Sequence, residues 1–178
     1  MTSQQLNIGD NAPEFNLPGV DNRNHRLADF TNNVIVVMFT CNHCPYVKAY
    51  EDRLIEIQND YLDKGVSLVA ISSNSTRDYP EDGFEEMVIR AREKGYNFLY
   101  LRDESQSIAT AYGAQYTPEI FVFDKDRRLC YHGRIDDSKD PSKVTSSDLR
   151  KAIDALLSGR DIENPETHTF GCSIKWAH

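Results

Sequence analysis

The sequence predicts an α/β domain with a mixed central β-sheet, flanked by helices on both faces, and an N-terminal β-hairpin extension. Apolar runs rich in β-branched residues, at 34–39 and 66–71, are typical of strands buried on both faces. Segments with helical spacing of apolar residues lie between the early strands, which implies parallel pairing through right-handed crossovers. A polar turn at 124–128 joins two later strand-like runs and predicts an antiparallel hairpin.

The remaining elements follow from the same periodicities. Two short runs between prolines and turn residues predict the N-terminal hairpin, and four glycines mark helix ends. The tail, 161–178, has no regular period, but its aromatic end predicts that it docks on the body of one domain spanning 1–178. The expected strands are 15–17, 25–27, 97–101, 119–123 and 129–133, and the expected helices are 47–61, 84–91, 108–112 and 149–157.

Composition argues against several classes of partner. The formal net charge is -8, and no basic stripe is present, so we expect no binding to nucleic acid or to an anionic membrane. The apolar runs are far shorter than the ~20 residues that a membrane-spanning helix needs. The first residues lack a charged segment followed by an apolar one, so we expect no signal peptide and a cytoplasmic location.

The most informative motif is Cys41-Asn42-His43-Cys44, which lies between a buried strand and an amphipathic helix. In a reducing compartment such a pair is more often redox-active or metal-binding than a structural disulfide. We expect Cys41 to be the more exposed thiol and the nucleophile, because a helix N-terminus favours a thiolate, and Cys44 to resolve the mixed disulfide. A protonated His43 would lower the pKa of Cys41.

Two alternatives without redox chemistry remain open for this pair, a zinc site and an inert pair of thiols. A structural zinc site needs a second closely spaced ligand pair, whereas Cys130 and Cys172 are 42 residues apart. We therefore predict no metal and no cofactor. Cys130 lies in an alternating strand and is expected to be inert, and Cys172 is expected either to pack or to act as a third redox thiol.

Thr117-Pro118, directly before an apolar strand, is the second useful signal. A cis bond there would expose the backbone of Thr117 for strand-like pairing with a substrate. The simpler interpretation is a proline that begins a strand.

The strand–Cys-x-x-Cys–helix unit and the later Thr-Pro resemble the thioredoxin superfamily. Six further segments resemble its redoxin branch, which includes alkyl hydroperoxide reductase and thiol-specific antioxidant proteins. The resemblance implies a thioredoxin-like fold, Cys41 as nucleophile, Cys44 as resolving thiol and Pro118 as a cis-proline facing them. The segments are 12–17, 41–48, 79–82, 103–106, 133–137 and 171–176.

The chain departs from the familiar patterns at four positions. Peroxiredoxins carry Pro-x-x-x-Thr-x-x-Cys; with Cys44 in the peroxidatic place, Val37 and Cys41 replace the proline and the threonine. Ile35 stands where thioredoxins carry a buried acid, and Tyr116 where related redoxins carry a cysteine. We therefore predict a thiol–disulfide oxidoreductase acting on disulfides of proteins or small molecules. The alternatives are a thiol peroxidase with antioxidant activity and a non-catalytic redox-sensing module.

Overall fold

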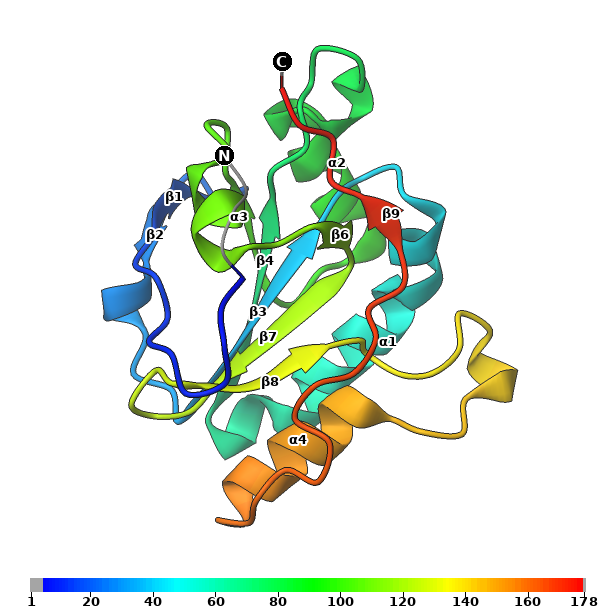
Figure 1. The fold of residues 1–178 in the computed structure, drawn as a ribbon. Helices are drawn as coiled ribbons and strands as arrows, with labels where there is room; N and C mark the ends of the chain where they lie inside the picture. Colours follow the sequence, from blue (N-terminus) through cyan, green and yellow to red (C-terminus); the bar gives the residue numbers. More distant parts are fainter. Residues whose placement is uncertain (1–4, 178) are drawn as a thin grey trace.

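The computed structural model describes residues 5–177; residues 1–4 and His178, which belong to the predicted domain and tail, lie outside the described residues. A central sheet of five strands has the order β5-β4-β3-β7-β8 (Figure 1). The first three of these pair in parallel, and β7 and β8 join antiparallel. The predicted mixed sheet is confirmed. Its strands are β3 (Val34–Thr40), β4 (Val66–Ser72), β5 (Leu99–Arg102), β7 (Glu119–Phe123) and β8 (Leu129–Gly133).

Helices cover both faces of this sheet, as predicted. Alternate residues of β3 point to opposite faces, and each face has its own core. One core joins β3 to α1 (Pro45–Tyr61), α2 (Phe84–Lys94) and α4 (Asp148–Leu157). The other joins it to α3 (Ser107–Tyr112) and to the N-terminal hairpin of β1 (Asn16–Pro18) and β2 (Asn24–Arg26). No helix among residues 5–177 is long and apolar enough to cross a lipid bilayer.

The first helix begins one turn later than the cysteine spacing suggested. Pro45 is its first residue and Cys44 its N-cap. Proline suits this position because its ring fixes φ near the helical value and it has no N–H to leave unpaired. Cys44, rather than Cys41, therefore lies at the positive end of α1.

Two short strands carry no signal in the sequence. Strand β6 (Tyr116–Thr117) pairs antiparallel with β9 (Cys172–Ser173), near the end of the chain. Figure 1 shows β9, in red, beside β6. Two residues are too few to establish a period, so hydrophobic patterning could not predict either strand.

Candidate active site

The cysteine loop, residues 41–44, connects the end of β3 to the start of α1. Both thiols are free and buried: Cys41 is 1% exposed and Cys44 0%. Cys41 is expected from the sequence to be the more exposed thiol, but exposure hardly distinguishes the two, because Thr117 lies against both of them. The Sγ atom of Cys41 lies 3.6 Å from Oγ1 of Thr117, and that of Cys44 lies 3.4 Å from the Thr117 carbonyl oxygen.

The two thiols differ strongly in acidity. Hydrogen bonding from Cys41 lowers the pKa of Cys44 well below its usual range, and the backbone N–H of Val47 at the helix start and the thiol of Cys172 contribute. The same bond to Cys44 raises the pKa of Cys41, as do burial and the nearby charge of Asp82. These directions favour a thiolate at Cys44 over one at Cys41. The expectation from the sequence has Cys41 as the nucleophile.

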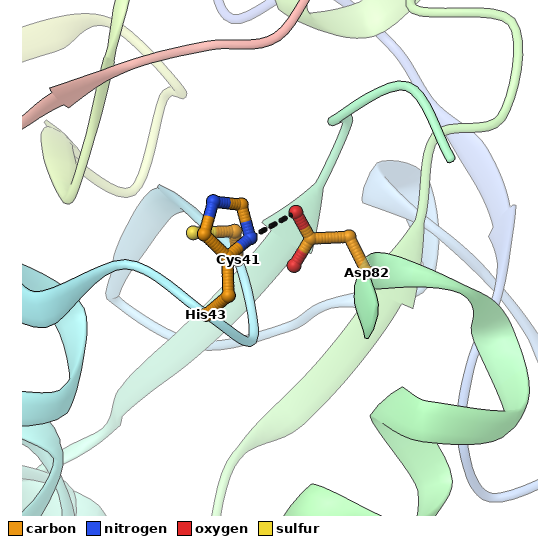
Figure 2. Close-up of side chains that lie close together, drawn as sticks. All are labelled: Cys41, His43 and Asp82. Carbon is orange, nitrogen blue, oxygen red and sulfur yellow. Dashed lines mark ion pairs between the residues drawn. The ribbon is translucent and has the colours of Figure 1, made fainter. Parts of the chain in front are cut away.

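A buried carboxylate that the sequence did not single out completes the site (Figure 2). Asp82 is 0% exposed, and its Oδ2 lies 2.5 Å from Nδ1 of His43. Ligand atoms of Cys41, His43 and Asp82 all lie within 4.8 Å of one another. The charge of Asp82 raises the pKa of Cys41, which is opposite to the effect expected of a protonated His43.

These three side chains are also of types that zinc accepts. Their fit is limited, because the carboxylate is already in use. Oδ1 of Asp82 accepts from the backbone N–H of Asn42 at 2.8 Å, and Oδ2 accepts from Nδ2 of Asn74 at 2.9 Å. A metal ion would have to displace the contact between His43 and Asp82, so the arrangement suits thiol chemistry better.

Hydrogen bonds fix Asn42, within the cysteine loop, to two other parts of the chain, the turn at 80–82 and strand β5. Its Nδ2 donates to the carbonyl oxygen of Glu81 at 2.8 Å, and its Oδ1 accepts from the hydroxyl of Tyr100 at 2.7 Å. Asn74 and Asp82 extend this network to the chain beyond β4. The carboxyl ends of parallel strands meet at one edge of a sheet, so the polar residues after β4 were the available signal.

The proline loop, residues 114–118, faces the cysteines from the opposite side. The Thr117-Pro118 bond is cis, as the family resemblance implied. Oε1 of Glu119 accepts from the backbone N–H groups of Gln115 and Tyr116, both at 2.9 Å, and its Oε2 lies 2.7 Å from Nε2 of His132. The buried carboxylate of Glu119 therefore fixes the proline loop through two of its backbone amides.

The two remaining cysteines have separate surroundings. Cys172 is half-buried and packs against the cluster formed by Cys41, Cys44 and Val47. Cys130 lies apart on β8, with its Sγ 3.6 Å from Oδ2 of Asp124. All other candidate residues come together: Cys41, His43, Cys44, Thr117, Pro118 and Cys172.

The chain is similar to several known proteins. Residues 8–132 match the model of the AhpC/TSA family. The thiol-disulfide oxidoreductase ResA of Geobacillus thermodenitrificans is 26% identical over 125 residues, which cover 68% of this chain and 66% of that protein. The crystal structure of an uncharacterized conserved protein from Geobacillus kaustophilus has a TM-score of 0.92 and 45% identity, covering 98% of this chain and 95% of that one. A hypothetical protein from Sinorhizobium meliloti 1021 has a TM-score of 0.92 and 39% identity, covering 98% and 97%.

Proposed function

This chain belongs to the AhpC/TSA family, and we propose that its thiol–disulfide exchange runs through the buried pair Cys41 and Cys44. The predicted redoxin family, thioredoxin-like fold and enzyme class, a thiol–disulfide oxidoreductase, are confirmed at that level. One observation carries the assignment to residues. Two thiols lie together at a helix start and face a cis-proline, and their acidities are driven apart.

The exchange proceeds in two displacements. The Cys44 thiolate attacks one sulfur of a substrate disulfide; a Cys44–substrate bond forms, and the other substrate sulfur leaves as a thiolate. Cys41 then gives up its proton and attacks Sγ of Cys44, which releases the second substrate thiolate. The protein ends with a Cys41–Cys44 disulfide, and the substrate has gained two electrons.

Asp82 supplies the proton acceptor for the second displacement. A buried thiol is a poor nucleophile until it loses its proton, and the position of Ile35 provides no acid for this purpose. The carboxylate of Asp82 and the imidazole of His43 lie beside Cys41 instead. We assign them the role of receiving the Cys41 proton.

The substrate is a disulfide of a protein or a small molecule. The backbone of Thr117, next to the cis bond, offers strand-type pairing to an extended segment that carries the disulfide. This supports a peptide disulfide as substrate. The cytoplasmic location remains a prediction.

Reduction of insulin disulfides by dithiothreitol tests the proposal. We expect Cys44→Ser to lower the catalysed rate to the uncatalysed background, because it removes the first displacement. The double variant Cys41→Ser/Cys172→Ser should do the same, because it removes both thiols that lie close enough to Cys44 to carry out the second displacement. Cys130→Ser is the matched control and should keep the wild-type rate. Wild-type rates in both active-site variants would overturn the assignment. A wild-type rate at background would instead favour the redox-sensing module.

A thiol peroxidase is the second candidate, because Cys44 directly precedes Pro45 at the helix start and carries the thiolate. Its attack on a peroxide would give a sulfenic acid, which Cys41 would convert to the disulfide with release of water. Such an activity would be antioxidant. Stopped-flow consumption of hydrogen peroxide by the reduced protein tests it: a rate no greater than that of free cysteine excludes it.

A further inference from the structure

The chain's own C-terminal segment occupies the strand edge next to the cis-proline. Strand β9 pairs antiparallel with β6, so that Cys172 lies opposite Thr117 and Ser173 opposite Tyr116 (Figure 1). These are the backbone groups that we assign to substrate pairing. The C-terminal segment therefore lies where an extended substrate would lie.

Gly171 brings this segment into direct contact with the cis bond. A Cβ atom at Gly171 would lie 2.3 Å from the carbonyl oxygen of Thr117 and 3.4 Å from Cδ of Pro118. No side chain fits in that space, so only glycine permits the approach. Because of this close contact, the next residue, Cys172, packs against the cluster that contains Cys41 and Cys44.

Beyond β9, specific hydrogen bonds hold the segment in place. The backbone N–H of Lys175 donates to Oδ1 of Asn74 at 3.0 Å, and its carbonyl oxygen accepts from the backbone N–H of Ser75 at 2.7 Å. Asn74 is also a partner of Asp82. Docking of the segment is thereby connected to the carboxylate beside Cys41.

Cys172 is the accessible thiol of this group. Cys41 and Cys44 are at most 1% exposed, whereas Cys172 is half-buried and packs against both. Burial raises the pKa of Cys172, and its hydrogen bond to Cys44 adds to the effect. The second cause disappears once Cys44 enters a disulfide, which leaves Cys172 a better nucleophile in the oxidised protein.

We infer that Cys172 is a third catalytic thiol, which accepts the disulfide from the buried pair and presents it to external thiols. The inference rests on the proposed function of that pair. The Cys172 thiolate attacks Sγ of Cys44, a Cys44–Cys172 bond forms, and the Cys41–Cys44 bond breaks. Cys41 leaves as a thiolate and takes up the proton that Cys172 has lost. The step is an isomerisation and needs no oxidant or reductant.

This exchange lets an external reductant deliver electrons to the buried pair of Cys41 and Cys44 through Cys172. An external thiol attacks the half-buried Cys172 sulfur, a bond between the two sulfurs forms, and Cys44 leaves as a thiolate. A second external thiol then attacks the external sulfur of this mixed disulfide and releases Cys172 as a thiolate. Reduction restores three thiols, and a protein substrate displaces β9 from the edge of β6.

Tryptic mapping of diamide-oxidised protein tests the inference. Cys41 and Cys44 share the tryptic peptide 27–48, and Cys172 lies in 161–175. We expect Cys41→Ser to yield a cross-link between these two peptides. Cys44→Ser and the combined Cys41→Ser/Gly171→Val variant should not, because they remove the partner sulfur or displace the strand. Absence of the cross-link in Cys41→Ser overturns the inference.

A rate measurement separates a catalytic thiol from an incidental one. Reduction of the oxidised protein by glutathione should be about tenfold slower, or more, in Cys172→Ser. Cys130→Ser is the control and should keep the wild-type rate. An unchanged rate in Cys172→Ser also overturns the inference. The internal disulfide of peptide 27–48 should form in Cys172→Ser in either case, and its absence would instead overturn the proposed function.

Discussion

Two loops form the site, and each contains or contacts a histidine that pairs with a buried carboxylate. In the cysteine loop His43 meets Asp82; below the proline loop His132 meets Glu119. Both carboxylates are at most 2% exposed, and both accept hydrogen bonds from the backbone. The difference lies in what else they face. Asp82 lies beside the Cys41 thiol. The carboxylate oxygens of Glu119 instead contact two backbone amides and the imidazole of His132.

This difference separates two functions of a buried charge. A carboxylate beside a thiol changes its acidity and can receive its proton. A carboxylate that accepts from backbone N–H groups fixes a loop, and its loss costs folding free energy. We therefore expect Asp82 to govern the rate of exchange and Glu119 to govern the position of the cis-proline.

Removing the charge of Asp82 should have the largest effect. Asp82→Asn is expected to lower the catalysed rate of insulin reduction by roughly 100-fold, the scale of a lost general base. The pKa of Cys41 should fall, because a repelling negative charge is gone. Ultraviolet absorbance of the thiolate against pH measures that shift, which a merely structural role would not produce. An unchanged rate together with an unchanged titration would refute this role.

The stability of the reduced protein should depend on pH through the titration of Cys44. Its folded-state pKa lies below the ordinary value of 9.0, so the unfolded chain binds more protons between the two values. The free energy of unfolding should therefore rise with pH across that window. Above pH 9 the raised pKa of Cys41 reverses the slope, because the folded state then holds the extra proton. Urea unfolding of reduced wild type and Cys44→Ser measures this, and the variant should lack the rise.

The corresponding change at the second pair should affect stability more than chemistry. Glu119→Gln keeps an oxygen that accepts from the two amides, but it replaces the acceptor facing Nε2 of His132 with an NH2 donor, which that nitrogen can accept from only when it carries no proton. We therefore expect a loss of about 1–3 kcal/mol in the free energy of unfolding. Urea titration measures it. The thiolate absorbance of Cys44 should stay as in wild type. A strong change in thiol acidity without loss of stability would show that the two pairs do not differ as described.

The smallest expected effect concerns the support of the cysteine loop. Tyr100→Phe removes the hydroxyl that donates to Oδ1 of Asn42, and should cost about 1 kcal/mol of unfolding free energy. Exchange should continue at a rate close to wild type, since no group near the sulfur atoms is lost. Thermal unfolding and the insulin assay, run together, check both parts.

The sequence predicted the architecture well, because its strands are long apolar runs and its helices have regular spacing. It also predicted which residues meet: Cys41, Cys44, Thr117 and Pro118 lie together. Asp82 was not singled out, since a single acid in a polar segment has no spacing that marks it. Its position depends on how the loop after β4 folds back over the cysteines.

The roles of the two cysteines could not be derived either. These roles depend on where α1 begins, because a shift of one turn in its first residue moves the positive N-terminus of the helix from Cys41 to Cys44. The pairing of β6 with β9 joins residues far apart in the chain through two residues each, which no local pattern encodes.

Trapping with a disulfide-containing peptide tests the central claim most directly. The reduced variants Cys41→Ser and Cys44→Ser, each also carrying Cys172→Ser, are mixed with the peptide, alkylated and mapped by mass spectrometry. We predict that a mixed disulfide accumulates on Cys44 of the variant that lacks Cys41, because the attacking thiolate remains and both thiols that could resolve the mixed disulfide are gone. Accumulation on Cys41 of the Cys44→Ser variant, with none on Cys44 of the other, would contradict the assignment of the thiolate to Cys44.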